Sequence, residues 1–223
     1  MGREDHKPEH IPLATVRRLA SYFNCLRRLR ERGVQQVSSK QLADRIGIKS
    51  SQVRHDLYYF GEFGQRGYGY EVASLERELA KILNVEHGQN MIIVGAGHIG
   101  QAIANYKNFE GRSLYVKGLF DINPRLIGLV IGGVRVRDID EIPQVVVEEK
   151  VSIGVITVPA EAAQSTADIL VQAGIRGIWN FAPVELQVPE EIPVQNEHLS
   201  VSLLTLSYLM KHRSVSSSFM PKF

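Results

Sequence analysis

The stretch Ile92-Ile93-Val94-Gly95-Ala96-Gly97-His98-Ile99-Gly100 decides the fold, because it places an apolar run directly before the pattern Gly-x-Gly-x-x-Gly. A second apolar run ends in the acidic Asp121, 21 residues after Gly100. Each glycine has a steric role in such a turn. Gly95 permits the sharp change of direction, Gly97 lets the backbone approach a pyrophosphate, and Gly100 lets the following helix pack close to the strand. The spacing therefore predicts the strand, turn and helix of a dinucleotide-binding domain.

Asp121 predicts which nucleotide binds. Its carboxylate would accept hydrogen bonds from the adenosine ribose hydroxyls and repel a 2'-phosphate, which favours NAD(H) over NADP(H). The helix N-terminus would attract the pyrophosphate. A purely structural glycine turn is the alternative, but the apolar helical pattern after the motif favours a nucleotide site. Besides Asp121, the residues of the motif expected to contact the cofactor are Gly95, Ala96, Gly97, His98, Ile99 and Gly100.

The charge differs between the front and the back of the chain. Residues 1–85 hold 15 Lys and Arg against 10 Asp and Glu, whereas residues 86–223 hold 11 against 14. A basic front suggests a nucleic-acid partner, although solvated helix faces would give the same balance. Cys25 is the single cysteine, which excludes a disulfide framework and a cysteine metal cluster. With no signal peptide and no apolar run of ~18 residues, we expect no membrane partner and a cytoplasmic protein.

Apolar residues recur at helical spacing in the front segment. We expect a first helix over residues 13–31, ended by Gly33, with most of its arginines on the outer side. Its expected apolar face comprises Val16, Leu19, Ala20, Phe23 and Leu26. A second helix should begin at Ser38, whose capping-box partner is Gln41, and end at Gly47. A third should cover residues 50–60. Two short helices across a glycine turn predict a helix-turn-helix.

The segment 61–70 alternates glycines with aromatic residues, which predicts a tight hairpin, the wing of a winged helix. The third helix would enter the major groove, where Gln52 can pair with adenine and Arg54 with guanine or phosphate. Arg66, near the hairpin tip, could enter a minor groove. A helical packing module with a surface hairpin is the alternative. The residues expected to contact DNA are Ser50, Ser51, Gln52, Arg54, His55, Tyr58, Arg66, Gly67 and Tyr68.

Beyond Asp121 short apolar strands alternate with helices, which predicts an α/β fold with a doubly wound parallel sheet of the Rossmann type. The strands are expected near residues 134–136, 153–158 and 177–181, and the helices near residues 138–149 and 160–173. Ligands of such sheets bind where strands end, although a plain structural turn is equally open at these positions. The further candidate cofactor contacts are Thr157, Val158, Pro159, Asn180, Phe181, Ala182 and Pro183.

The chain ends in an apolar helix from about residue 199, too short to span a membrane. Its wide apolar face indicates packing on a partner subunit, with packing on its own sheet as the rival. A helix near residues 75–83 leads into a short linker. We therefore expect a winged-helix DNA-binding domain over residues 1–85, a Rossmann NAD(H)-binding domain over 86–198, and a C-terminal helix and tail over 199–223.

These motifs resemble the Rex family, the redox-sensing transcriptional repressors of bacteria. The similarity runs from about residue 11 to residue 211, and its most specific pieces are residues 52–64, 66–70, 95–100 and 180–183. The resemblance implies a homodimer whose C-terminal helices exchange between subunits, and an inverted-repeat operator DNA that NADH releases and NAD+ does not. It implies no catalysis. Within this scheme, Tyr106 on the first Rossmann helix is our expected reporter of the nicotinamide charge.

The chain also departs from the family pattern. Asn24 and His198 stand where some relatives pair a basic residue with an acidic one, so that ion pair is absent here. His55 stands where lysine is common, and Tyr58 where a small residue is. Two other functions stay open: an NAD-dependent dehydrogenase with an accessory DNA-like domain, and a repressor with another nucleotide ligand. The dehydrogenase is disfavoured because no histidine lies between residues 99 and 197 to transfer a proton.

Overall fold

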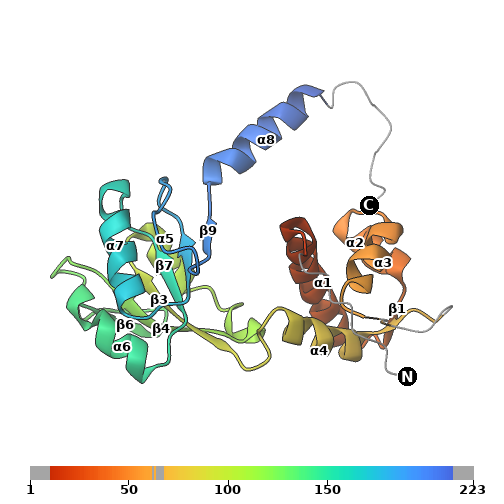
Figure 1. The fold of residues 1–223 in the computed structure, drawn as a ribbon, viewed down its shortest axis with the longest axis horizontal. Coiled ribbons are helices and arrows are strands. Elements are labelled where there is room, and N and C mark those ends of the chain that lie inside the picture. Colours follow the sequence, from red (N-terminus) through yellow and green to blue (C-terminus); the bar gives the residue numbers. More distant parts are fainter. Residues whose placement is uncertain (1–10, 62, 64–67, 213–223) are drawn as a thin grey trace. The chain divides into compact units, whose positions relative to one another are not determined.

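A computed structural model of the protein describes residues 11–61, 63 and 68–212. The chain forms two compact units, Met1–Gly88 and Gln89–Phe223 (Figure 1). The described part of each unit has its own hydrophobic core: one cluster in the first unit and a cluster on each side of the sheet in the second. Each unit is therefore considered by itself.

The first unit contains a helix-turn-helix, as the sequence predicts. Its helices are α1 (Leu13–Glu31), α2 (Ser39–Ile46), α3 (Ser50–Tyr58) and α4 (Val72–Ile82). Ser38 caps α2 by accepting a hydrogen bond from the Gln41 backbone N–H, and the Gln41 side chain returns one to the Ser38 N–H. Gly47 ends α2 in the left-handed conformation (φ 76°), where a Cβ would be strained. The third helix ends two residues earlier than expected, and α4 begins three residues earlier.

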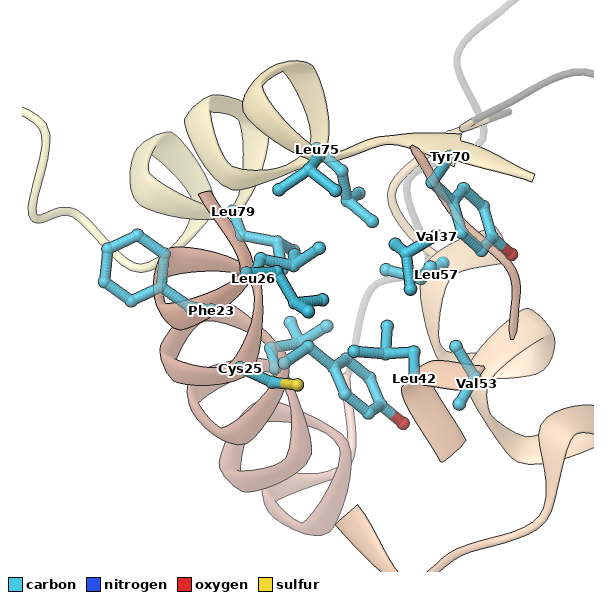
Figure 2. Close-up of a cluster of buried hydrophobic side chains, with 14 of the residues drawn as sticks. Phe23, Cys25, Leu26, Val37, Leu42, Val53, Leu57, Tyr70, Leu75 and Leu79 are labelled. Carbon is cyan, nitrogen blue, oxygen red and sulfur yellow. The ribbon is translucent and has the colours of Figure 1, made fainter. Parts of the chain in front are cut away.

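Apolar side chains from all four helices meet in the core of this unit (Figure 2). Leu26 of α1, Leu42 of α2 and Leu79 of α4 are fully buried there. Of the expected apolar face of α1, Leu19, Phe23 and Leu26 are buried and Ala20 is half-buried, whereas Val16 is 37% exposed. Thr15 takes the inward position beside Val16, because its hydroxyl faces the buried carboxylate of Asp56.

A short strand pair lies at the end of the expected wing. β2 (Tyr70–Glu71) pairs antiparallel with β1 (Gln36–Val37), a strand before α2 that was not predicted. The close approach explains Gly69, where a Cβ would lie 2.6 Å from the Val37 carbonyl oxygen. Residues 62 and 64–67 lie outside the described residues, so the hairpin within segment 61–70 stays a prediction. Arg66 and Gly67, at the expected tip, lie outside the described residues.

In its described part, the second unit holds a seven-stranded sheet with the order β5-β6-β4-β3-β7-β8-β9. All neighbours pair parallel except β5 and β6. The strands are β3 (Gln89–Val94), β4 (Leu114–Phe120), β5 (Val130–Ile131), β6 (Val134–Arg137), β7 (Ile153–Ile156), β8 (Gly177–Asn180) and β9 (Val194–Asn196). The chain reverses its winding between β3 and β7, so the expected doubly wound sheet is confirmed and its switch point lies at the end of β3.

The helices of this unit are α5 (His98–Ala104), α6 (Ile142–Glu148) and α7 (Ala160–Gln172). The prediction that Tyr106 lies on the first of them is wrong, because α5 ends at Ala104. Asn105 closes the helix by donating its side-chain amide to the Gln101 carbonyl. The expected helix over 138–149 begins as a 3-10 turn, Ile139–Glu141, before α6.

α8 (Leu199–His212) follows β9 and buries none of its residues (Figure 1). Leu203 is 68% exposed and Leu206 52% exposed, so the rival expectation that this helix packs on its own sheet is wrong within one chain. Among the helices described, none is long and apolar enough to cross a membrane.

Candidate functional site

The glycine motif forms the loop between β3 and α5, at the carboxyl edge of the sheet. Gly95 has φ 104°, and a Cβ there would lie 2.8 Å from the Thr157 carbonyl oxygen. A Cβ on Gly100 would collide with the Gly95 carbonyl oxygen. The steric roles expected for these two glycines therefore hold. At Gly97 a Cβ would meet nothing within 4 Å, so no protein atom fills the space beside this position.

Asp121 follows β4 and reaches the same loop. Its Oδ2 accepts a hydrogen bond from the Ala96 backbone N–H at 2.7 Å, and its Oδ1 accepts one from the Asn123 N–H at 2.8 Å. The carboxylate is thus oriented beside the glycine turn by two backbone groups. The fold brings together the acid and the three glycines, which lie 21 to 26 residues before it in the sequence.

Thr157 follows β7, the strand next to β3. Its hydroxyl lies 2.8 Å from the Gly95 carbonyl oxygen and 3.0 Å from that of Val94. The hydroxyl therefore ties the end of β7 to the glycine turn. Val158 is half-buried behind it, and Pro159 is exposed at the start of α7.

Asn180 ends β8, and its side chain organises the next loop. The amide donates to the Val184 carbonyl at 2.9 Å and to Asn196 Oδ1 at 2.9 Å, while Oδ1 accepts from the Ala182 N–H at 3.0 Å. Asn180 and Ala182 are buried, Phe181 is half-buried and Pro183 is exposed. The Asn180 side chain thus shapes the loop, and the loop's exposed edge lies beside the end of β7, since the Phe181 N–H donates to the Ile156 carbonyl.

Tyr106 lies elsewhere. It is 48% exposed and lines a cavity of about 550 Å³ with Phe109 and the first residues of β4 and β6, whereas no glycine of the Gly95–Gly100 motif lines that cavity. An aromatic series links the two regions: Tyr106 packs on Phe109, Phe109 on Trp179, and Trp179 on Phe181, with ring centres 4.8, 6.1 and 4.6 Å apart. The structure does not place Tyr106 beside the motif.

The third helix of the first unit presents the expected outer face. Ser51, Arg54, His55 and Tyr58 are exposed, while Ser50 and Gln52 are half-buried. Arg54 donates to the Ser39 hydroxyl at 3.2 Å, which joins α3 to the start of α2. Tyr68, the first described residue after position 63, is 79% exposed. These side chains are available to a ligand that lies along α3.

A buried carboxylate holds this helix on α1, and the sequence reasoning missed it. Asp56 is fully buried. It accepts hydrogen bonds from Arg18 at 2.5 and 2.7 Å, from the Tyr22 hydroxyl at 2.6 Å and from the Gln52 amide at 2.8 Å. Asp56 shares the inward spacing of Val53, Leu57 and Phe60, and a charged residue within that apolar row was the available signal.

This network sets the ionisation of Asp56. Burial raises its pKa, but the hydrogen bonds from Arg18, Tyr22 and Gln52 outweigh burial and hold the pKa below the ordinary value. Burial and the hydrogen bond to Asp56 in turn raise the pKa of Tyr22. Asp56 is therefore ionised at neutral pH, and its charge orients the amide of Gln52, one of the expected DNA contacts.

The lowered pKa of Asp56 predicts that the free energy of unfolding depends on pH. Because its folded pKa is lowered, Asp56 contributes stability above the unfolded value of 3.8, and this stability is lost as the pH falls through the folded pKa. We expect Asp56→Asn to lower the free energy of unfolding by about 3 kcal/mol at pH 7, and the difference to shrink below pH 3.8. Urea unfolding followed by circular dichroism measures it. Asp44→Asn, an exposed carboxyl on α2, is the control; a loss that is equal at every pH would contradict the role of Asp56.

Comparisons with known proteins agree with both halves of this description. The family model "CoA binding domain" matches residues 87–184, and the model "Putative DNA-binding protein N-terminus" matches residues 10–57. Curated proteins called "Redox-sensing transcriptional repressor Rex" are 50% identical in Clostridium acetobutylicum, over 92% of this chain and 96% of that protein, and 47% identical in Clostridium novyi, over 92% and 97%.

Solved structures give the same result. A protein called RSP, described as a Rex-family repressor, matches in complex with NAD+ and operator DNA with a TM-score of 0.84, at 45% identity over 92% of this chain and 95% of that one. Its complex with NADH matches with a TM-score of 0.82, at 43% identity over 92% and 96%. The expected family resemblance is thereby confirmed.

Proposed function

The chain belongs to the Rex family of redox-sensing transcriptional repressors, and we propose that it binds inverted-repeat operator DNA and releases it when NADH binds. The NADH/NAD+ ratio is then the signal. The observation that carries the proposal is the presence in one chain of an outward-facing recognition helix, α3, and a glycine turn with a matched acid, Asp121. A DNA-bound repressor of this kind acts in the cytoplasm.

The DNA contacts are proposed on the exposed face of α3 and the segment that precedes β2. Arg54 is positioned by Ser39 to reach guanine or phosphate, and Gln52 is held by Asp56 with its side-chain oxygen still able to accept a hydrogen bond from adenine. Phosphate contacts position the protein, whereas base contacts specify the sequence. The full proposed set is Ser50, Ser51, Gln52, Arg54, His55, Tyr58, Arg66, Gly67 and Tyr68.

The cofactor contacts are proposed at the carboxyl edge of the sheet. The loop fits a dinucleotide because Gly97 is open, because the first N–H groups of α5 have no partner within the helix, and because Asp121 lies beside the turn. Asp121 would accept hydrogen bonds from the adenosine ribose. Thr157 and the loop that Asn180 shapes would border the nicotinamide half. NAD(H) here supplies a signal, since the relatives are named as repressors and not as enzymes.

A switch of this kind needs differential affinity. NADH can shift the protein away from its DNA-binding arrangement only if it binds the other arrangement more tightly. Two recognition helices must also lie about 34 Å apart to contact both halves of a palindrome, so a small rotation of the two copies abolishes binding. Contacts with the reduced nicotinamide therefore only need to change the distance between the two recognition helices of the dimer.

Release by the reduced cofactor tests this function directly. We expect NADH to lower the fluorescence anisotropy of a labelled inverted-repeat duplex bound to the protein, and NAD+ at the same concentration to leave it high. The absorbance of NADH, followed in the same cuvette, should stay constant. Failure to bind the duplex would contradict the proposal. A steady loss of NADH with a candidate substrate would instead support the dehydrogenase alternative.

Gly97→Leu separates cofactor binding from folding. Since a side chain at this position meets no protein atom within 4 Å, we expect an unchanged melting temperature and unchanged operator affinity, together with a loss of NADH-dependent release. Anisotropy measures the release. Gly100→Ala is the contrasting variant, because its Cβ collides with Gly95 and should destabilise the fold. Normal release from the Gly97→Leu protein would refute the placement of the cofactor.

The exposed apolar side chains of α8 support a homodimer. Its apolar side chains Leu203, Leu206 and Leu209 are 43–68% exposed in a single chain, and a contiguous apolar face of this kind is typical of an interface. A second copy that exchanges the same helix would cover it, and would also supply the second recognition helix that a palindrome requires.

The dimer can be tested on the same helix. We expect light scattering to give the mass of two chains for the wild type, and Leu206→Asp to raise the dissociation constant at least about a hundredfold, because the aspartate would be buried without a partner. Tyr208→Asp is the matched control, because Tyr208 is 63% exposed and lies on the opposite side of α8 from Leu206, and this protein should stay dimeric. A Leu206→Asp protein that remains dimeric would exclude this face as the interface.

A further inference from the structure

A small basic cavity, open to solvent, lies between the C-terminal ends of α1 and α2, and its three arginines are exposed. It has a volume of about 190 Å³ and is lined by Cys25, Arg28, Leu29, Arg32 and Arg45. At about 30 Å³ for each water molecule, it has room for roughly six waters, or for one small oxyanion with part of its hydration shell. Three of its five lining residues carry a permanent positive charge.

The three arginines of the cavity differ from Arg18, Arg27 and Arg30 of α1, which lie beside carboxylates. Arg18 binds Asp56, Arg27 lies 3.5 Å from Glu31, and Arg30 lies 3.0 Å from Glu76. In contrast, no carboxylate among the described residues lies within 4.0 Å of the guanidinium groups that line the cavity. The nearby carbonyl ends of α1 and α2 offset only part of this charge, since a helix terminus carries about half an elementary charge.

We propose that this cavity binds a phosphate group. Guanidinium groups present planar pairs of N–H donors that match phosphate oxygens, and several converging arginines bind phosphate more strongly than one. An anion in the cavity would also remove the mutual repulsion of the three cations. Binding of a free phosphate compound here is independent of the function proposed for α3 and the glycine turn, whereas binding of operator backbone rests on the proposed DNA binding.

The position of the cavity indicates that its phosphate is distinct from those beside the bases read by α3. Arg28 lies six residues after Tyr22, the last α1 residue that contacts α3 through Asp56, which is about 9 Å along the helix. On α2, Arg45 lies six residues after Ser39, which Arg54 of α3 contacts, so it is about 9 Å away. The phosphate belongs either to a free phosphate compound or to operator backbone outside the bases that α3 reads.

Cys25 supplies a local readout. It is the single cysteine, it lines the cavity, and it is 4% exposed, so its alkylation depends on access through the cavity. Burial raises the pKa of the thiol, which makes the unprotected reaction slow but does not affect a comparison with and without ligand. Neutral iodoacetamide avoids attraction of the reagent by the arginines.

The test measures the alkylation rate of Cys25 in the full-length protein by mass spectrometry. We expect pyrophosphate to slow the reaction and raise the melting temperature, relative to sodium chloride of equal ionic strength. In Arg32→Gln the concentration needed for protection should rise about tenfold or more. Arg17→Gln, an exposed arginine of α1 outside the cavity, should behave as wild type.

The same alkylation measurement with pyrophosphate and with operator duplex identifies the source of the phosphate. Protection by pyrophosphate without DNA would identify a free phosphate compound as the ligand, whereas protection only by operator duplex would identify backbone phosphate, and either supports the site. The proposal is overturned if neither pyrophosphate nor duplex protects Cys25 or raises the melting temperature, or if both effects persist unchanged in the Arg32→Gln protein.

Discussion

The close approach of Gly95 to the chain after β7 is the constraint on which the second unit depends. A Cβ at this position would lie within 3 Å of the Thr157 backbone, so only glycine allows β3 to end where the winding of the sheet reverses. The Thr157 hydroxyl then holds the Gly95 carbonyl, and Asp121 holds the Ala96 N–H. Three strand ends are thereby joined around one turn. The same joint leaves Gly97 open, which is where a pyrophosphate needs to approach the backbone.

The first unit depends on a different interaction, a buried charge. Asp56 stabilises the contact of α1 with α3 only while it is ionised and while Arg18 and Tyr22 satisfy it, because an unpaired carboxylate in this core would cost more than the contact gains. Oδ1 of the same carboxylate also accepts a hydrogen bond from the half-buried Gln52 of α3 and orients it. The proposed recognition of DNA through Gln52 and the stability of the helix-turn-helix are therefore joined in one network. In the glycine turn, likewise, the geometry that builds the fold also presents the proposed cofactor site.

The parts of the structure that depend on local chemistry could be predicted from the sequence. The capping box of Ser38 and Gln41, the left-handed Gly47 and the glycine motif each act within a few residues, and their elements lie where expected. Elements without such a signal were missed or misplaced. β9 has only three residues, too few for an alternating pattern, and α5 stops at Ala104 because of its cap at Asn105. Arg18 and Tyr22 lie 38 and 34 residues before Asp56, and Asn196 lies 16 residues after Asn180, so only the folded chain reveals these partners.

The central claim is that operator and NADH favour different arrangements of one protein. Thermodynamic linkage then requires that operator DNA weaken NADH binding by the factor by which NADH weakens operator binding. The most direct measurement is a titration with NADH followed through the fluorescence of Trp179, the single tryptophan, in the presence and absence of saturating operator duplex. We predict an NADH dissociation constant that operator raises by the factor found in the reciprocal experiment, with a duplex of scrambled sequence as the control. An NADH affinity that operator leaves unchanged would contradict the account.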